Sequence, residues 1–281
     1  MQVTIKKEIS SKGVGIHYNK LVNLKLKPAP ENSGIVFIRT DILEKNNKIK
    51  VCANSIDTGA LSTKLKNEDG IFVATVEHLI SAIHCFKINN LIIEIDGPEV
   101  PIMDGGSEDF CFMLECAGTV TQNAPKHKIK LLKEIKVKNG EAYIIAKPSN
   151  NIKINFVSDF PSNKIKEQSF SFDLEKQDFV KEISSAKTIA NILEVETLQK
   201  MGMGLGGSLQ NTMVYNENSI LNESYSYNIN DFVKHKILDF MGDIYLECME
   251  VIAEFECYKS GHKLNHALIC EILKTNNYQL I

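Results

Sequence analysis

FVKHKILDFMGD, residues 232–243, repeats its apolar side chains at the period of an α-helix. His235 and Asp239 stand four residues apart in this stretch, so on a helix an imidazole and a carboxylate share one face about one turn apart. Such a pair can hold one metal ion from two sides. The same spacing also suits a surface hydrogen bond or a capped histidine in a core, and the pair by itself leaves these alternatives open.

A second helical pattern, TVEHLISAIH at 75–84, offers a third ligand. Glu77 and His78 are adjacent in it, and neighbours on a helix diverge by about 100°, so both cannot easily face one ion. We expect His78 to complete a set with His235 and Asp239, which leaves one coordination position open for water, as in a catalytic zinc site. Glu77 is then free to take a proton. The alternative is a solvated carboxylate in the first turn, favoured by the helix dipole.

The charge of the ligand set indicates the metal. Two neutral imidazoles and one carboxylate leave a divalent ion with net positive charge, which keeps a bound water acidic and polarises a carbonyl group. We therefore expect Zn²⁺, although iron(II) fits the same ligands.

Composition limits the class of protein. The chain has 281 residues, enough for two domains that each bury a core. Its formal charge is −3, and basic residues are scattered among acidic ones, so we expect no nucleic-acid partner. The N-terminus lacks an apolar signal core and no stretch approaches about 18 uninterrupted apolar residues, so we expect a soluble, cytoplasmic protein without membrane insertion. Seven cysteines without a C-x-x-C pair are expected to be reduced thiols.

Strand and helix periodicities alternate in both halves of the chain, which predicts an α+β fold. Periodicity lapses at 119–128, where Pro125 interrupts the pattern, so we place an N-terminal domain at 1–122 and a C-terminal domain at 123–281. Both halves run strands first and helices later, which favours duplication of one α+β unit. The expected strands are 22–28, 34–40, 90–96, 135–140 and 142–148, and the expected helices are 75–86, 107–118, 175–184, 190–201, 229–242 and 261–275.

Three further strings complete the pattern: GVGIHYNKLVNLKLKPAPENSGIVFIRTDI at 13–42, DGPEVPIMDGGSEDF at 96–110 and YKSGHKLNHAL at 258–268. With the two helical stretches they resemble, in order and without a large gap, the zinc-dependent UDP-3-O-acyl-N-acetylglucosamine deacetylases of Gram-negative lipid A synthesis. The resemblance implies two similar α+β domains with the helices packed between the sheets and the active site at the domain junction. It also implies a hydrolase that removes acetate from a small molecule, an acylated UDP-sugar, in the committed step of lipid A biosynthesis.

The resemblance places the metal ligands at His78, His235 and Asp239 and the general base at Glu77. His262 follows Ser-Gly and is expected in the first turn of the last helix, where the helix dipole disfavours an imidazolium. A protonated histidine there needs a carboxylate nearby, and Asp243 is the candidate. The resemblance implies that this pair stabilises the oxyanion and helps to protonate the leaving amine.

Four more positions match the family. Thr188 matches a threonine that hydrogen-bonds the tetrahedral intermediate, and Lys236 and Lys259 match basic contacts near the active centre and the diphosphate. His17, in GVGIH, matches a further diphosphate contact. A threonine, lysine or histidine at such places can equally be an ordinary surface residue.

The resemblance implies a strand-helix-strand insert at about 184–214 that forms a passage for the acyl chain. Its apolar side chains suit a passage or a small core equally well; they are Ile189, Ile192, Leu193, Val195, Leu198 and Met201. Where the family usually has S-R-A-R-T-F-G-F, residues 184–191 read SSAKTIAN, so both phenylalanines are replaced and acyl selectivity is open. The glycine-rich MGMGLGGS at 201–208 lacks the Lys-Ser/Thr of a phosphate loop, and we expect a turn after a helix there.

His266 departs from the family, which usually has Asn at this position. It forms a rival metal pair with His262 by spacing, but we expect it to have no role in the primary site. His84 and His127 are expected to be a partly buried and a surface imidazole, respectively. Two other functions stay open: a deacylase of the same scaffold for another acylated amino sugar, and a non-catalytic sugar-nucleotide binding protein.

Overall fold

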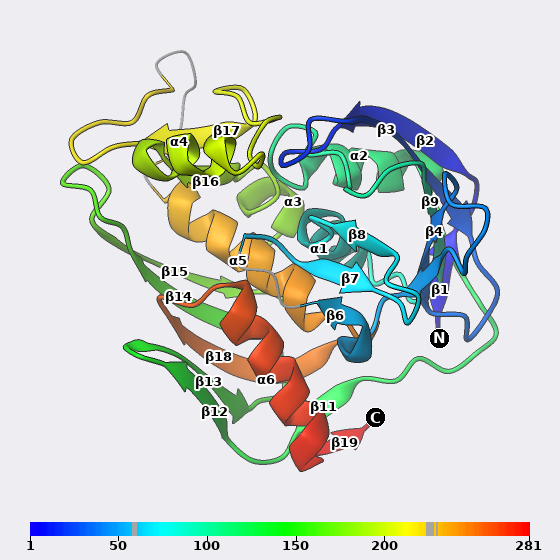
Figure 1. The fold of residues 1–281 in the computed structure, drawn as a ribbon. Coiled ribbons are helices and arrows are strands. Elements are labelled where there is room, and N and C mark those ends of the chain that lie inside the picture. Colours follow the sequence, from blue (N-terminus) through cyan, green and yellow to red (C-terminus); the bar gives the residue numbers. More distant parts are fainter. Residues whose placement is uncertain (58–60, 223–227, 229) are drawn as a thin grey trace.

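Alternating apolar residues build two large sheets. The computed structural model describes residues 1–57, 61–222, 228 and 230–281, and these ranges form an α+β fold, as the sequence predicts. The first sheet has the strand order β2-β3-β9-β4-β5, in which β4 and β9 are parallel and the other pairs are antiparallel (Figure 1). Its strands are β2 (Ile9–Val14), β3 (Leu21–Pro28), β9 (Leu91–Ile95), β4 (Ile35–Arg39) and β5 (Lys48–Lys50).

The second sheet is organised around β18 (Val251–Tyr258), which pairs antiparallel with β13 and parallel with β14. Alternate residues of β18 are buried, so one face of this sheet lies on the core. The other strands are β11 (Ile129–Leu131), β12 (Ile135–Asn139), β13 (Ala142–Pro148), β14 (Lys153–Asp159), β15 (Glu167–Asp173) and β19 (Tyr278–Leu280).

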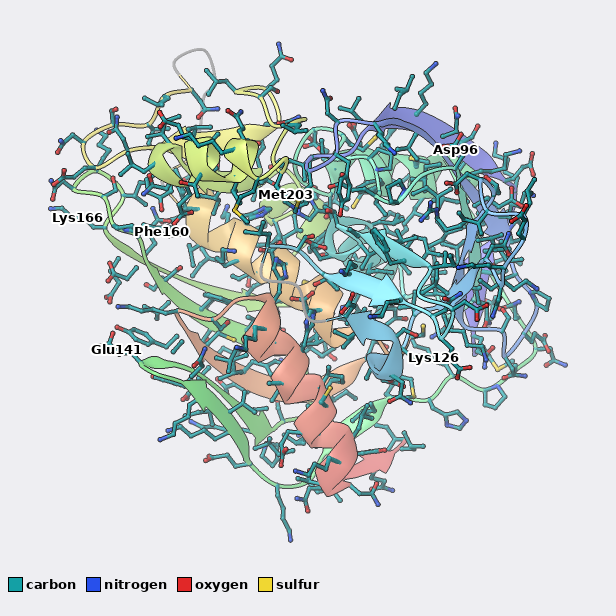
Figure 2. All side chains as sticks on the ribbon, viewed as in Figure 1. Asp96, Lys126, Glu141, Phe160, Lys166 and Met203 are labelled. Carbon is teal, nitrogen blue, oxygen red and sulfur yellow. The ribbon has the colours of Figure 1, made fainter. Side chains whose placement is uncertain are left out.

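Helices lie between the two sheets, and buried side chains fill the space around them (Figures 1 and 2). The four that do so are α1 (Glu77–Cys85), α2 (Glu108–Ala117), α5 (Asp231–Ile244) and α6 (His262–Thr275). Position 229 of the expected helix 229–242 lies outside the described residues. Within the described ranges, every helix is too short or too polar to cross a membrane.

Helices α1 and α5 pack closely because Gly242 has no side chain. A Cβ at this position would lie 2.2 Å from the backbone oxygen of Glu77. His84 on α1 strengthens the contact: its Nδ1 lies 3.0 Å from the Met241 carbonyl oxygen, and its ring stacks on Tyr245 with centroids 4.3 Å apart. His84 is therefore fully buried, not partly buried as expected, because it fills the interface of two helices.

A strand-helix-strand unit lies over one end of the structure (Figure 1). β16 (Thr188–Asn191) pairs in parallel with β17 (Thr212–Tyr215), and α4 (Ile192–Lys200) connects them across the glycine-rich turn. This turn lies against the N-terminal half, since the backbone amides of Leu205 and Gly206 donate to the carbonyl oxygens of His17 and Ile16.

The remaining elements are short. The helix expected at 175–184 is only α3 (Phe179–Glu182), because the Asp178 side chain accepts from the amides of Val180 and Lys181 and caps the helix there. The small strands are β1 (Val3–Ile5), β6 (Ile56–Asp57), β7 (Lys64–Lys66), β8 (Phe72–Ala74) and β10 (Thr119–Thr121), and a 3₁₀ turn covers Ala53–Ser55. The first large sheet uses residues up to 95 and the second begins at 129, and we propose on this basis that the chain divides into units at 1–122 and 123–281.

Candidate active site

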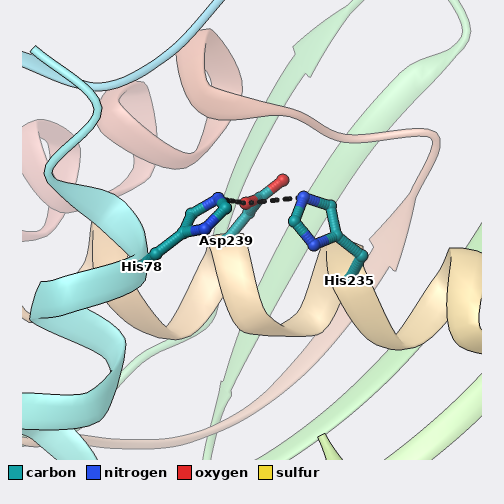
Figure 3. Close-up of side chains that lie close together, drawn as sticks. All are labelled: His78, His235 and Asp239. Carbon is teal, nitrogen blue, oxygen red and sulfur yellow. Dashed lines mark ion pairs between the residues drawn. The ribbon is translucent and has the colours of Figure 1, made fainter. Parts of the chain in front are cut away.

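The three expected ligands converge from two helices. His78 lies in the first turn of α1, and His235 and Asp239 lie one turn apart on α5 (Figure 3). Their ligand atoms all lie within 4.8 Å of one another. The Asp239 Oδ1 atom is 3.7 Å from Nε2 of His78 and 3.4 Å from Nε2 of His235, and all three residues are buried. The two imidazoles therefore direct the same ring nitrogen at one carboxylate oxygen.

Backbone carbonyl groups fix the tautomers of both histidines. Nδ1 of His78 is 3.2 Å from the Gly106 oxygen, and Nδ1 of His235 is 3.0 Å from the Ala186 oxygen. A carbonyl oxygen only accepts, so each Nδ1 donates a proton and each Nε2 presents a lone pair. Burial, followed by the neighbouring His235, lowers the pKa of His78 to about 3, and burial lowers the pKa of His235, so both rings are neutral.

The Asp239 carboxylate has the properties of a cation ligand. Its Oδ1 is buried and has no hydrogen-bond partner among the described residues, which is costly for a carboxylate oxygen. Its Oδ2 accepts from Nζ of Lys236 at 2.9 Å. Burial alone would raise the pKa of Asp239, but the positive charge of Lys236 holds that pKa below its usual range. An ionised oxygen beside two imidazole lone pairs is a fitting donor set for a divalent metal ion.

Glu77 and His262 lie beside this set. The Glu77 Oε2 atom accepts from the Thr63 amide at 3.1 Å, and its Oε1 is 3.7 Å from Nε2 of His262. Burial raises the pKa of Glu77 to about 8, although the adjacent His262 opposes the rise. Glu77, Asp239 and His262 form a second group close enough to share a cation, so Asp239 belongs to both groups.

His262 and Asp243 form the expected pair. His262 lies in the first turn of α6, and its Nδ1 donates to Oδ2 of Asp243 at 2.9 Å. Burial alone would lower the pKa of His262, but the Asp243 carboxylate outweighs it and raises the pKa to about 10. The imidazole is thus held as an imidazolium at neutral pH, and its Nε2 lies 3.7 Å from Glu77, the carboxyl group whose pKa is raised.

Two of the other expected residues lie at the candidate site, and Lys259 lies away from it. Thr188 and His17 line the same pocket as His78, His235 and Asp239, the candidate metal-binding group. The Thr188 hydroxyl donates to the Gly105 oxygen at 3.2 Å. Lys259 is not among the described residues that line this pocket. Lys259 directly follows the last residue of β18, and its Nζ pairs with Asp159 at 3.1 Å and with Glu141 at 3.5 Å.

An apolar cavity of about 460 Å³ adjoins the pocket, and His17, Leu61 and Thr188 line both. Of the apolar residues expected around a passage, Leu193 and Met201 are 74% and 70% exposed. Leu193 lies on the outer face of α4, and Met201 follows the last residue of that helix. Asn191 caps α4 by accepting from the Leu193 amide at 3.0 Å. The expected residues that do line the cavity are Ile189, Ile192, Val195 and Leu198.

Two buried residues were not expected from the sequence. Thr63 contacts Glu77, and Glu99 accepts from the amides of His17 and Tyr18 and from the hydroxyl of Thr75. Thr63 stands outside the strings that carry the resemblance, and Glu99 lies within the string at 96–110. The contacts of both side chains depend on partners elsewhere in the chain, which a motif does not display. His127 is exposed, as expected.

His266 shares no ion site with His262 in the described structure. Its Nε2 instead lies 2.9 Å from the Thr63 hydroxyl oxygen and 3.4 Å from Oδ1 of Asp243. The spacing of four residues along α6 therefore brings both rings to opposite oxygens of one carboxylate.

A family model and the curated relatives that resemble this chain all carry the name of one deacetylase. The model of the UDP-3-O-acyl N-acetylglycosamine deacetylase family matches residues 2–274. The chain is 39% identical over 274 residues to the UDP-3-O-acyl-N-acetylglucosamine deacetylase of Shewanella violacea, covering 97% of this chain and 89% of the relative. It is 38% identical over 273 residues to the enzyme of that name from Syntrophus aciditrophicus, with 97% and 86% covered. It is 40% identical over 274 residues to that from Acidithiobacillus ferrooxidans, with 97% and 90% covered.

Proposed function

Because the chain belongs to the UDP-3-O-acyl N-acetylglycosamine deacetylase family, we propose that it hydrolyses the acetamide of UDP-3-O-acyl-N-acetylglucosamine and releases acetate. The observation that carries the proposal is the set of His78, His235 and Asp239 directly beside Glu77 and His262. The reaction would be the committed step of lipid A biosynthesis in the cytoplasm.

The ligand set favours zinc. His78, His235 and Asp239 would hold the ion with two neutral nitrogens, one carboxylate oxygen and an open position, and iron(II) suits the same donors. When bound, the ion would acidify a water molecule and polarise the carbonyl group of the acetamide.

Glu77 is the proposed general base. It is adjacent to the ligand set, and a carboxyl group with a pKa near the working pH can both accept and return a proton. Glu77 would take the proton as the water oxygen forms a bond to the amide carbon. The Thr63 amide holds one of its oxygens, which leaves the other free to face the reacting water.

His262 is the proposed acid. Its imidazolium would stabilise the negative charge on the former carbonyl oxygen, and the Thr188 hydroxyl would be a second donor after exchanging the Gly105 oxygen for the oxyanion. When the C–N bond breaks and its electron pair stays on nitrogen, His262 would supply the proton that completes the amine. Asp243 keeps the ring oriented and charged, and Lys236 adds positive charge through its contact with Asp239.

The apolar cavity would take the acyl chain of the substrate, since Ile189, Val195 and Leu198 line it and it opens beside the metal-binding group. His17 and Lys259 are the proposed diphosphate contacts. Lys259 would have to exchange its carboxylate partners for phosphate oxygens.

The test combines metal analysis with acetate release. Protein purified without added metal salts is analysed for zinc and iron, and acetate is measured with UDP-3-O-acyl-N-acetylglucosamine and with its analogue that lacks the acyl group. We expect one zinc or iron per chain and faster release from the acylated sugar. His78→Ala, His235→Ala and Asp239→Ala should each lose metal, and full retention in one of them would reassign that ligand. Binding without acetate release would support a non-catalytic protein, and release only from other acylated amino sugars would support the related deacylase.

A further inference from the structure

The Asp243 carboxylate is fully buried and has four donors around it. His262 Nδ1 and Asn265 Nδ2 lie 2.9 and 2.8 Å from its Oδ2. On the other side, the Thr63 hydroxyl lies 2.5 Å and His266 Nε2 lies 3.4 Å from its Oδ1. Inside a protein such donors set the rotation of a carboxylate, and the rotation of Asp243 sets the ring of His262.

Thr63 also reaches the opposite side of the reaction. It is fully buried, and its backbone amide donates to Oε2 of Glu77 at 3.1 Å while its hydroxyl contacts Asp243. One residue therefore contacts both the proposed base and the carboxylate that holds the proposed acid. The Glu77 Oε1 and His262 Nε2 atoms of these two groups lie 3.7 Å apart.

The direction of each hydrogen bond follows from the partners. A carboxylate held by several donors only accepts, so the single hydroxyl proton of Thr63 points to Asp243. The Thr63 oxygen must then accept from His266, whose Nε2 is 2.9 Å away, and this fixes the proton of His266 on Nε2. The Nδ1 of His266 is buried without a hydrogen-bond partner in the described ranges, as suits the nitrogen that carries no proton.

We propose that Thr63 and His266 are positioning residues of the active site. Thr63 sets Glu77 and the Asp243–His262 pair relative to each other, and His266 acts through Thr63 by fixing the rotation of its hydroxyl. This inference rests on the proposed deacetylase function and gives a role to His266, for which the sequence indicates none.

The experiment compares Thr63→Val with Thr63→Ser in the metal-loaded protein. Valine keeps the shape and the backbone amide but removes the hydroxyl, and serine keeps the hydroxyl. Loss of a hydrogen bond to a charged group predicts a fall in kcat of about 10- to 100-fold for Thr63→Val with little change in KM. Thr63→Ser should recover most of that loss. Metal content should stay the same in both, because Thr63 contacts none of the three ligands.

His266 is tested by His266→Leu against His266→Gln, whose side-chain amide can still donate to Thr63. We expect His266→Leu to lower kcat and His266→Gln to recover it. The double variant of Thr63→Val and His266→Leu should lose no more than Thr63→Val alone, since both changes act through one hydroxyl. If Thr63→Val does not fold, the two His266 variants carry the test.

A second readout does not depend on activity. The proton on Nδ1 of His262 should give a downfield ¹H NMR signal in the wild-type protein and in Thr63→Ser, and this signal should shift or broaden in Thr63→Val. Wild-type protein without acetate release would refute the proposed function alone. Unchanged kcat and unchanged signal in Thr63→Val, or equal losses in Thr63→Ser and Thr63→Val, would overturn the positioning role of Thr63. Additive losses in the double variant would overturn the route through the hydroxyl.

Discussion

Replacement of Gly242 by alanine should disturb the metal-binding group without touching any ligand. The added Cβ would lie 2.2 Å from the backbone oxygen of Glu77, more than an ångström short of an ordinary contact of 3.4 Å. A backbone oxygen cannot rotate away, so α1 must move relative to α5. His78 moves with α1, while His235 and Asp239 stay on α5.

The size of the effect follows from two opposing terms. Alanine is better than glycine in a helix by about 1 kcal/mol, but overpacking of a tight interface costs about 1–3 kcal/mol and more when backbone must shift. We expect a net loss of roughly 1–2 kcal/mol, or about 2–6 °C in Tm for a chain of this size. Misplacement of a ligand by about 1 Å should weaken metal binding by about 10- to 100-fold.

The assays are thermal unfolding and competition with a chelator for the metal. Gly261→Ala is the matched control, because nothing lies within 4 Å of its added Cβ and its φ of −157° is extended. If Gly242→Ala has the Tm and the metal affinity of Gly261→Ala, the close approach of α1 and α5 does not set the ligand geometry and the reasoning fails.

Three further outcomes are expected. Glu77→Ala should keep its metal but lose about 10²–10⁴-fold in kcat, and near-normal turnover would remove Glu77 as the base. Ile189→Phe should shift the preference in kcat/KM towards shorter acyl chains, at about 0.8 kcal/mol for each methylene excluded from the cavity. Asn191→Phe should lower stability because the helix cap is lost, and it should leave the dependence of kcat/KM on acyl length unchanged. Burial alone would raise the pKa of Glu250, but Lys126 at 2.8 Å lowers it to about 2. A lowered pKa contributes stability that is present above the unfolded value of about 4.5 and is lost as the pH falls towards 2. Between these pH values the free energy of unfolding should therefore fall by about 3 kcal/mol less in Glu250→Gln than in the wild-type protein. Parallel curves of unfolding free energy against pH for the two proteins would contradict this.

The local part of the site was accessible from the sequence. Helical periodicity gives α1 and α5 to within a few residues, and spacing along one helix is enough to place His235 and Asp239 on a common face. The helix positions and the shared face of His235 and Asp239 depend only on residues a few positions apart, and a sequence displays these directly. The α+β class follows for the same reason, because each strand and helix carries its own apolar pattern.

The parts that could not be predicted depend on contacts across the chain. Thr63 and Asp243 are 180 residues apart, and no spacing rule links them. The period of α4 could have shown that Leu193 does not share the face of Ile192, Val195 and Leu198, whereas Met201 lies beyond the end of the helix. What it could not show is which face meets the cavity, because that depends on how α4 rests on β16 and β17.

The apolar cavity and the candidate metal-binding group share one segment of this chain. The Ala186 carbonyl orients His235, and two residues later Thr188 begins the strand that leads to the apolar cavity. The segment is held on the loop that orients His78, since the Ser107 amide donates to the Ser184 oxygen at 2.7 Å and the Thr188 amide donates to the Gly105 oxygen at 2.7 Å. A change of cavity shape that moved the start of β16 would therefore also turn the imidazoles. Substitutions at Ile189 and beyond can alter the cavity wall without this cost, because they lie past the last of these backbone bonds. Under the proposed role of the cavity, position 189, where the family usually has phenylalanine, is a place at which acyl selectivity can change while the candidate metal-binding group is preserved.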